Sequence, residues 1–313
     1  MPSDFNLVSI DAQRALEEFS DDFALALAQG SVESWAKEYG RYKASRALKT
    51  TFYVPVSAAG YVELKGDIKY RELFQKSFSL VPKTWQDGWD GLASVIEAPD
   101  FIGWDSEAEQ FAAAASSLLN ELIATELVTN PVGWDLKAYF ADDHPFNIFD
   151  AGVGSFDNDI TGAGTSPSIA NLKTAKANFR KIKGANGKPL GLRMTHVLIP
   201  SAQEETWKDL LEQDMLIQTV GSSFGAVGNR HKGTVKPIVS DELASDAKWY
   251  PLALNKVGMY PWVCQDEGAP EEILSDKSSD KYKRTLKVGV AYVLRANAAL
   301  AMPHCAQRWE GLA

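Results

Sequence analysis

Apolar residues between positions 106 and 129 recur with the i, i+3, i+4, i+7 spacing of one helix face, as at Phe111, Leu118 and Leu122. Ser106 with Glu109 forms a capping-box pattern at the start of this run. Asn130-Pro131 ends the run, because the residue before a proline disfavours helical geometry. At ~1.5 Å per residue the helix would be about 35 Å long. We therefore predict a long spine helix with one apolar face, on which other elements pack.

The chain before residue 49 is also predicted to be helical. Apolar positions from Ile10 to Leu27 form a helical stripe that Gly30 ends, and a second piece starts at Ser31. This second piece has five basic residues against the single acid Glu38, namely Lys37, Arg41, Lys43, Arg46 and Lys49. We identify it as the clearest charge asymmetry of the sequence. It predicts either an arm that contacts packaged nucleic acid or another acidic partner, or a solvated helix face.

Residues 49–84 have the pattern of an extended excursion. β-forming residues fill positions 50–56, and Pro55 within this run restricts it to an edge strand. A second β-leaning stretch covers residues 70–80. Long extended segments are more often functional than idle, and unpaired strand edges need a cover, for which a partner subunit is the natural candidate. Residues 85–104 then supply a short apolar segment that leads into the spine helix.

The second half of the chain has an α/β pattern. After a loop at 152–168, a helix with proline in its first turn begins at Ser166-Pro167 and ends at Gly184. Ser201 with Glu204 suggests a second capping box, opening a helix that carries Trp207. The remaining predictions are a buried strand at 194–199, a glycine-punctuated loop at 221–233, strands at 235–239, 249–254 and 260–264, an acidic surface loop at 266–280 and a long strand at 285–302.

Composition and charge describe an ordinary globular chain. The 313 residues have a net charge of −9, which argues against a general nucleic-acid binder. No apolar run reaches the ~18 residues of a membrane span, and the N-terminus lacks a signal-peptide pattern. Cys264 and Cys305 are far apart, and reduced cysteines packed in a core are favoured over a disulfide.

A search for catalytic chemistry gives mostly negative results. Asp142-Asp143-His144 could supply metal ligands, but no second ligand set accompanies it. The sequence has no phosphate-binding loop, dinucleotide fingerprint or nucleophile elbow. The tryptophans Trp85, Trp89 and Trp104 suit either ligand stacking or core packing, and the basic turn from Asn229 to Lys232 suits either an anion or solvent. We therefore predict a protein that is not an enzyme and that has no cofactor.

The order of parts resembles that of the major capsid proteins of tailed phages, which have the Hong Kong 97 fold. An N-terminal arm, an extended excursion, a long helix, an α/β lobe and a final long strand follow one another in both. More specifically, residues 139–146, Tyr-Phe-Ala-Asp-Asp-His-Pro-Phe, resemble a segment of the Mu-like prophage major head subunits. Residues 168–192, the following Val197-Leu198-Ile199-Pro200 and the strand at 290–302 are similar to the same family. The resemblance covers the chain from about Lys49 onward.

This resemblance implies an α+β fold of the Hong Kong 97 type, divided into five segments. These are an N-terminal arm (1–48), an E-loop (49–84), a P-domain with the spine helix (85–150), an A-domain (151–284) and a return strand of the P-domain with the C-terminus (285–313). It also implies functional surfaces. They are an intersubunit E-loop with Tyr53, Val54, Tyr61, Lys65 and Lys69, an A-domain axial loop with Gly225, Gly228, Arg230 and Lys232, and a DNA-facing arm with Lys37, Arg41, Lys43 and Arg46.

The function implied is that of a major capsid protein that assembles as pentamers and hexamers into an icosahedral shell around double-stranded DNA. Portal, scaffold and decoration proteins are further expected partners, with no membrane contact. The protein would reside in the virion capsid after assembly in the host bacterial cytoplasm. Two alternatives remain open, an encapsulin-like nanocompartment shell and a soluble α/β enzyme that uses the Asp142-Asp143-His144 loop.

Overall fold

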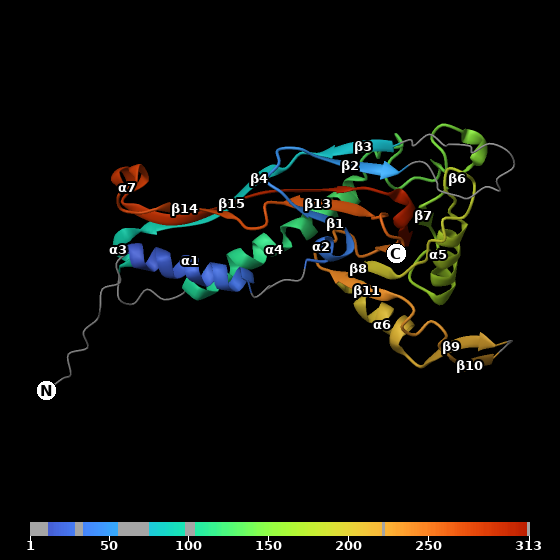
Figure 1. Cartoon of the computed structure of the whole chain (residues 1–313). Coiled ribbons are helices and arrows are strands. Elements are labelled where there is room, and N and C mark those ends of the chain that lie inside the picture. The colour runs from blue at the N-terminus through green and yellow to red at the C-terminus, as the bar shows by residue number, and fades with distance from the viewer. Residues whose placement is uncertain (1–11, 29–33, 56–74, 98–103, 221–222, 312–313) are drawn as a thin grey trace.

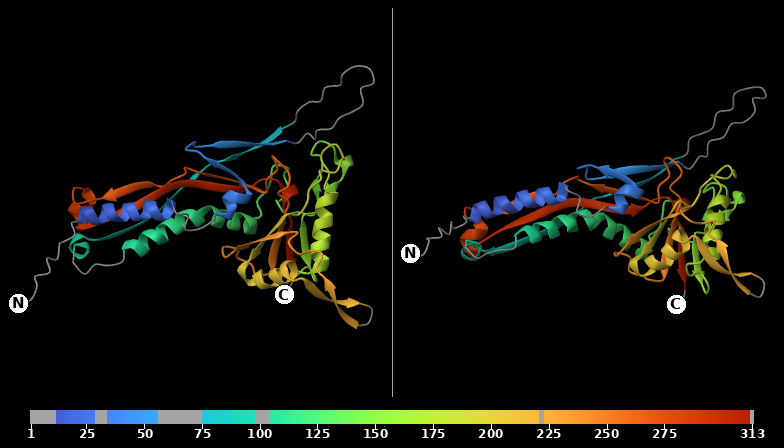
Figure 2. Two further views of the ribbon diagram at one scale, coloured as in Figure 1. Left: turned by 60° about the horizontal axis from the view of Figure 1, so that its bottom comes forward. Right: turned by 90° about the horizontal axis from the view of Figure 1, so that it is seen from below.

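A computed structural model describes residues 12–28, 34–55, 75–97, 104–220 and 223–311 (Figure 1). The molecule is elongated, with two large sheets at different places along its length. We call them the long sheet, which runs through the extended part, and the lobe sheet, which lies at the opposite end. A two-stranded ribbon leaves the body beside the lobe (Figure 2).

The predicted spine helix is confirmed as α4 (Trp104–Thr129), in which Leu119, Ile123 and Leu127 are buried. It begins before Ser106, which therefore lies inside the helix, so the predicted capping box is wrong. It ends before Asn130, whose φ of 50° is left-handed. By length and composition alone, Glu107–Thr129 would pass for a membrane span, with a mean hydropathy of 1.3, which the sequence analysis did not predict. A core helix of a soluble protein meets the same criteria, and α4 packs on α1 (Ala12–Ala28) and on the long sheet.

The long sheet has the strand order β1-β13-β15-β14, with β4 also paired to β15. The strands are β1 (Arg41–Ala44), β4 (Lys83–Leu92), β13 (Trp262–Asp266), β14 (Glu271–Ser275) and β15 (Lys287–Leu300). Val288, Val290 and Tyr292 alternate along β15 and face α1 and α4 in one core cluster. Two short helices, α3 (Ala93–Ile96) and α7 (Asp280–Thr285), lie at the far end (Figure 1).

Three strands of the long sheet differ from the sequence predictions. Residues 41–44 form β1, parallel to β13, where a helix is predicted, and β14 lies within the predicted acidic loop. β4 occupies the stretch predicted only as a short apolar segment. It contains only three large apolar residues, Trp85, Trp89 and Leu92, among polar residues and glycines, so the strand depends on pairing with β15 and not on local propensity. Gly88 permits this pairing, because a Cβ there would lie 2.7 Å from the carbonyl oxygen of Val290.

The lobe sheet has the order β11-β8-β12-β16-β7. Its strands are β7 (Asp159–Gly162), β8 (His196–Pro200), β11 (Lys236–Ser240), β12 (Lys248–Leu252) and β16 (Arg308–Gly311). Helices α5 (Ile169–Lys181) and α6 (Glu204–Glu212) cover one face, burying Phe179 and Trp207 in a cluster with alternate strand residues. The opposite face packs against the end of α4 and α2 (Trp35–Tyr39). The lobe is therefore a three-layered unit that shares its inner core with α4.

Most predicted elements of the lobe are confirmed, but their ends and two loops differ. Ser168, not Ser166, caps α5 by accepting a hydrogen bond from the Asn171 amide. Gln203 precedes α6 and no side chain caps that helix, so the second capping box is also wrong. The loop predicted at 221–233 is largely a hairpin of β9 (Met215–Val220) and β10 (Ser223–Gly228). β7 lies within the predicted loop at 152–168, and β16 has no sequence prediction.

The predicted excursion is confirmed as a ribbon of β2 (Thr50–Pro55) and β3 (Gln75–Leu80), which pair only with each other in the described part of the chain. Its predicted tip lies outside the described residues. Phe52 and Leu80 anchor the base of the ribbon in a cluster with Val263 and Met302.

The two large sheets do not follow the segment boundaries expected from the sequence. β13 and β14 precede residue 285 but belong to the long sheet with β15, and β16 follows β15 but completes the lobe sheet. The chain therefore enters the lobe after α4, returns to the long sheet at β13 and finishes in the lobe.

Candidate assembly surfaces

The residues proposed for the intersubunit E-loop lie on and beyond the ribbon. Tyr53 in β2 is 61% exposed, and the backbone of Val54 pairs with Lys76 in β3. Tyr61, Lys65 and Lys69 lie outside the described residues. Because Tyr53 leaves a large aromatic surface uncovered on a ribbon whose edges pair with no other described strand, this part of the molecule suits a contact with another protein surface.

The spine residues selected from the sequence serve the core of this chain. Phe111 contacts the rings of Phe19 on α1 and Tyr292 on β15, with centroid distances of 5.9 and 6.1 Å. Leu118 and Leu122 are half-buried against the cluster that joins α4 to the lobe. Together they hold α1, α4 and β15 as one body.

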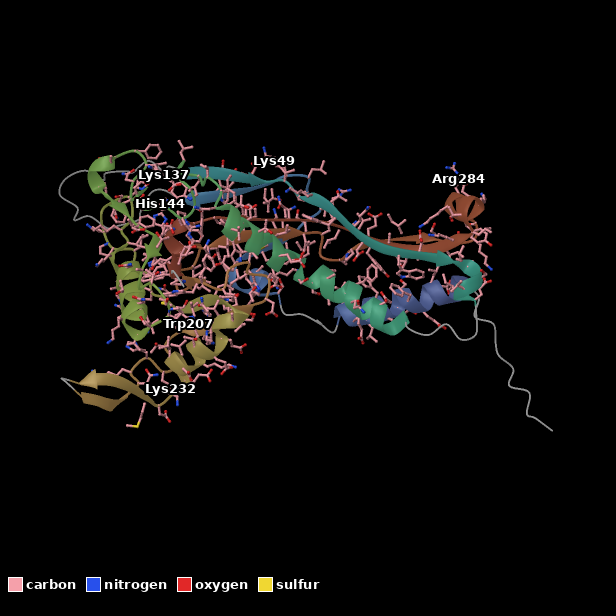
Figure 3. All side chains as sticks on the ribbon, turned by 180° about the vertical axis from the view of Figure 1, so that it is seen from behind. Lys49, Lys137, His144, Trp207, Lys232 and Arg284 are labelled. Carbon is pink, nitrogen blue, oxygen red and sulfur yellow. The ribbon has the colours of Figure 1, made fainter. Side chains whose placement is uncertain are left out.

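The predicted axial loop is replaced by the β9–β10 hairpin and its base. Gly225 and Gly228 lie in β10, and Arg230 is exposed in the turn that follows. The Lys232 ammonium forms a 2.6 Å ion pair with Asp214, at the base of the hairpin (Figure 3). The Asn229 side-chain amide donates to the carbonyls of Leu210 and Gln213, both at 2.9 Å. The hairpin therefore projects from a base that is fixed to the end of α6.

Two of the four cations proposed to face DNA lie beside carboxylates of the same chain. Lys37 lies 2.8 Å from Asp266, which is almost fully buried and also accepts a 2.6 Å hydrogen bond from the Tyr42 hydroxyl. Burial and this carboxylate raise the pKa of Tyr42. Arg46 lies 3.9 Å from Glu267. These contacts fasten residues 34–47 to β13.

The other two proposed cations differ from each other. The Arg41 guanidinium lies over the Phe52 ring at 5.6 Å, and Lys43 is exposed on β1. The structure therefore pairs Lys37 and Arg46 with carboxylates and leaves Arg41, Lys43 and Lys49 exposed without a described carboxylate partner.

A second basic segment, which is not among the predicted site residues, lies on α5 and the turn after it. Between Asp159 and Glu204 the chain has seven lysines and arginines and no acid. Six of these cations are exposed, and we call them the basic flank: Lys173, Arg180, Lys181, Lys183, Lys188 and Arg193. Beside this flank, burial and then the positive charges of Lys176 and Lys173 lower the pKa of His231. Counting acids as well as bases along the sequence would have identified it.

An acidic surface lies on α6 and the loop between β11 and β12. Residues 204–214 carry five acids and one lysine, and residues 241–246 carry three acids and no base. We call the exposed members the acidic flank: Glu205, Asp209, Glu212, Asp214, Asp241 and Asp246. Lys208 reaches both Glu204 and Glu205, at 2.8 and 3.0 Å, so one cation serves two carboxylates.

The candidate metal segment is a buried structural junction. His144 is fully buried, with Nδ1 2.6 Å from the Asp135 carboxylate and Nε2 3.1 Å from the carbonyl of Tyr139. Each ring nitrogen therefore lies beside an oxygen atom of the same chain. Within the described ranges, no group of three His, Cys, Asp or Glu side chains is arranged to hold a metal ion. Lys137 pairs with Asp143 at the surface above this junction (Figure 3).

The same junction joins the lobe to the long sheet. β5 (His144–Pro145) pairs with β6 (Ser155–Phe156), and the Tyr139 hydroxyl donates to the carbonyl of Pro261 at 2.7 Å. The Asn158 amide donates to the carbonyls of Tyr139 and Pro303. Burial, with the nearby charge of His144, lowers the pKa of His304 to about 4.

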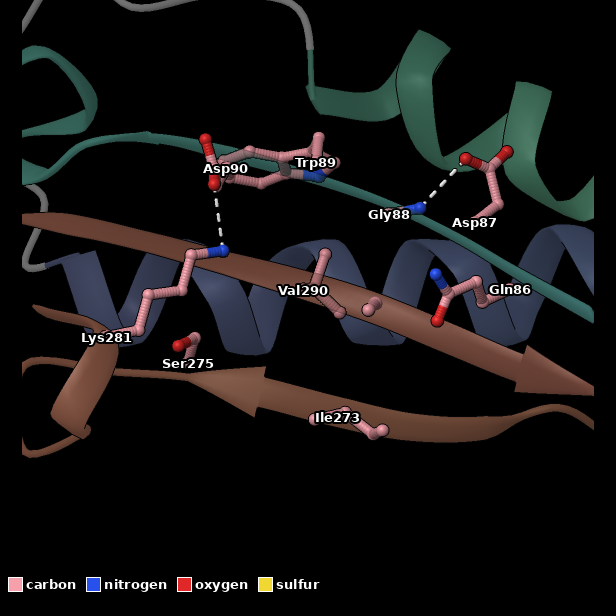
Figure 4. Close-up of a pocket in the computed structure, with 11 residues that line it drawn as sticks. Gln86, Asp87, Gly88, Trp89, Asp90, Ile273, Ser275, Lys281 and Val290 are labelled. Carbon is pink, nitrogen blue, oxygen red and sulfur yellow. Dashed lines mark hydrogen bonds and ion pairs between the residues drawn. The ribbon is translucent and has the colours of Figure 1, made fainter. Parts of the chain in front are cut away.

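A hollow of about 610 Å³ opens on the face of the long sheet opposite α1 (Figure 4). Gly88, Gly289 and Ala291 form its floor, and Ile273 on β14 is 51% exposed at its side. Asp90 forms ion pairs with Lys281 and Lys287 at 2.9 and 2.8 Å, which lower its pKa to about 2. This end of the long sheet is therefore covered on one face and open on the other.

Comparison with known proteins decides among these interpretations. A family model described as "Phage capsid protein" matches residues 94–313. The chain belongs to this family. As a phage capsid protein it has a structural function, forming the shell of a particle. No curated protein sequence matches it.

Solved structures with the same fold support this assignment. The capsid protein is similar to a chain of the procapsid of bacteriophage JBD30, with a TM-score of 0.53, 14% identity and coverage of 96% of this chain and 75% of that one. It is similar to a chain of Microbacterium phage Oxtober96, with a TM-score of 0.54, 15% identity and coverage of 87% of this chain and 86% of that one. It is also similar to a chain of the capsid of a native GTA particle, with a TM-score of 0.56, 9% identity and coverage of 90% of this chain and 92% of that one. At these identities the likeness concerns the fold, which is the Hong Kong 97 type.

Proposed function

We propose that this capsid protein is the major head subunit of a tailed phage and that its copies assemble as pentamers and hexamers into an icosahedral shell around double-stranded DNA. The observation that carries the proposal is the ribbon. It leaves the body with both edges unpaired in the described residues and with Tyr53 61% exposed. Unpaired strand edges promote aggregation of an isolated molecule, whereas in a shell they can pair with a neighbouring copy.

The open face of the long sheet supplies a complementary surface. The hollow above Gly88, Gly289 and Ala291 has a floor without large side chains, and Ile273 offers apolar surface beside it. In the proposed shell, residues 49–84 of one copy lie over a neighbouring copy. The spine helix and long sheet form the P-domain, and the lobe forms the A-domain. We revise the boundaries so that β13 and β14 belong to the P-domain and β16 to the A-domain.

The finer parts of the proposal rest on the resemblance of the sequence to the Mu-like major head subunits. The subunit is of the Mu-like type, on the resemblance of residues 139–146 and 168–192, and it acts through assembly and not catalysis. Assembly takes place in the cytoplasm of a bacterial host, with portal, scaffold and decoration proteins as partners and without a membrane. Packaged DNA is a non-specific partner.

Electron microscopy of the purified protein, combined with sedimentation velocity, tests the proposal. We expect closed particles, or pentamers and hexamers that convert to them when scaffold and protease are supplied. Nucleic acid inside particles made in cells supports the phage head, whereas an enclosed enzyme indicates a nanocompartment. A monomer that persists with all assembly factors present contradicts the proposal.

Deleting residues 58–65 tests the role of the ribbon. We expect a folded protein that no longer forms closed shells, because the base of the ribbon at Phe52 and Leu80 is retained. Deleting residues 256–257, in an exposed loop between β12 and β13, is the matched control and should leave assembly intact. Normal shells from the 58–65 deletion would show that the ribbon is not an intersubunit element.

A further inference from the structure

The basic flank has no counter-charge within the described part of its own chain. None of its six cations forms an ion pair with a described carboxylate, although this structure contains ion pairs at many other surface positions. Lys183 lies 6.0 Å above the Phe146 ring, which is an aromatic and not an anionic partner. The chain has a net charge of −9, so this concentration of positive charge is exceptional within it. An exposed surface of one sign attracts a partner of the opposite sign.

The helices of the basic and acidic flanks, α5 and α6, cover the same face of the lobe sheet. α6 lies beside β11, the first strand in the sheet order. α5 lies toward β16 and β7 at the other end, where the Gln307 amide reaches the carbonyl of Ala175 (Figure 1). The Lys176 ammonium on α5 also donates to the Thr234 hydroxyl at 2.7 Å, just before β11, so α5 crosses the sheet. One lobe therefore presents positive charge on α5 and negative charge on α6.

The charged residues within each flank share a helix face. Lys173 and Arg180 are two turns apart on α5, and Glu205, Asp209 and Glu212 follow a spacing of four and three on α6. All five are exposed. Each helix thus carries a row of like charges along its outer side, which is the arrangement that two antiparallel or parallel helices of opposite sign can match.

We propose that the basic flank of one copy docks against the acidic flank of a second copy, so that lobes associate head to tail in a ring. The inference rests on the proposed shell and names a contact within its pentamers and hexamers. A surface that meets a different surface of the next copy is heterologous, and such contacts close into rings when the rotation permits. Nucleic acid is a poorer match, because the acidic flank on the same lobe would repel a polyanion.

Charge reversal and charge exchange test this docking. Lys173→Glu with Arg180→Glu makes the row on α5 acidic, like the row on α6, and Asp209→Lys with Glu212→Lys gives the row on α6 a positive net charge, like the row on α5. We expect each double variant to lower the yield of rings and shells about tenfold or more, because like charges then face each other. Combining all four substitutions restores opposite signs and should recover most of the yield. Sedimentation velocity and electron microscopy measure both outcomes.

Controls separate docking from folding and from net charge. Lys256→Glu with Lys283→Glu changes the net charge equally at exposed positions outside both flanks, and should assemble normally. Lys173→Gln with Arg180→Gln removes charge without introducing repulsion. It should weaken the salt dependence of assembly between about 0.1 M and about 1 M salt, where the Debye length falls from about 10 to about 3 Å. Circular dichroism checks that every variant is folded.

The results distinguish this inference from the proposed function. Normal shells from both reversals, or no recovery in the fourfold exchange, overturn the docking while leaving the shell function intact. Normal shells that contain less DNA in the Lys173→Glu, Arg180→Glu variant also overturn it and identify the basic flank as a nucleic-acid surface. Failure of the unaltered protein to assemble with all factors present overturns the shell itself.

Discussion

Residues 34–49 and residues 169–193 are both basic, with net charges of +4 and +7, yet their cations have different surroundings. In the first segment Lys37 and Arg46 face Asp266 and Glu267 of the same chain. In the second, the exposed cations of the basic flank have no described carboxylate partner. A run of positive charge in a sequence therefore indicates a binding surface only when the fold leaves that charge unneutralised. The difference should appear in the free energy of unfolding of the unassembled protein.

Asp266→Ala should have the largest effect. The substitution leaves Lys37 and the Tyr42 hydroxyl without their buried acceptor and loosens the attachment of β1 to β13. We expect a loss of about 3 to 4 kcal/mol in urea unfolding, because breaking a buried ion pair leaves an uncompensated charge. Lys43→Ala, at an exposed position of β1, is the control and should change the free energy of unfolding by less than about 0.5 kcal/mol. Similar small effects from both would mean that the charges of this segment are not structural.

Acid should destabilise the protein through His304, a buried group that the fold keeps uncharged. Its pKa falls from 6.5 to about 4, so between these values the unfolded chain binds more protons than the folded one. The free energy of unfolding should therefore decrease as the pH falls from 6.5 towards 4, by about 3 kcal/mol. Urea unfolding across this range measures the slope, and His304→Gln should reduce it. An unchanged slope in that variant would assign the acid sensitivity to other groups.

Tyr42→Phe sharpens the comparison by removing one hydrogen bond and no charge. Asp266 keeps Lys37 and the amide of Gly268, so the carboxylate retains partners. We expect a loss of about 1 kcal/mol, the usual net value of one hydrogen bond. A loss as large as that of Asp266→Ala would indicate that the hydroxyl, and not the ion pair, fastens β1.

Arg180→Glu should have the smallest effect on stability, less than about 0.5 kcal/mol, because the side chain is exposed and outside every described ion pair. The same variant is expected to impair assembly. A charge change on α5 should therefore affect assembly more than stability, whereas the loss of Asp266 should strongly affect stability. Urea unfolding of the monomer beside sedimentation of the assembly mixture measures both. A large loss of stability would place Arg180 among the structural cations.

Elements with strong local patterns could be predicted from the sequence. The spine helix, the helical stripe of α1 and the long final strand show periodic patterns, and the strand with Val197, Leu198 and Ile199 is a continuous apolar run. β4 and β1 could not, since Trp85 and Trp89 stand among polar and glycine residues and Arg41–Ala44 is basic. Their partners β15 and β13 lie more than 190 residues away in the sequence. Such strands are determined by tertiary pairing.

The candidate surfaces were predicted less well than the fold. The excursion was identified because Pro55 and the β-forming run are local signals, and the ribbon follows from them. The role of Lys37 depends on Asp266, which is remote in sequence, so its pairing could not be anticipated. The hairpin at 215–228 was missed because its glycines resemble those of a loop. The absence of acids between Asp159 and Glu204 was visible in the sequence, but its meaning required knowing that no distant carboxylate covers it.

The two buried thiols give this protein internal reporters of local opening. Cys264 lies in β13 beneath the attached basic segment, and Cys305 lies at the junction between the lobe and the long sheet. Burial raises the pKa of Cys264 and raises that of Cys305 to about 12, so neither thiol reacts until its region opens. Because the chain has no other cysteine, the rates of thiol labelling followed by peptide mass spectrometry would report these two openings separately. The same experiment on shells and on subunits would show which region tightens on assembly.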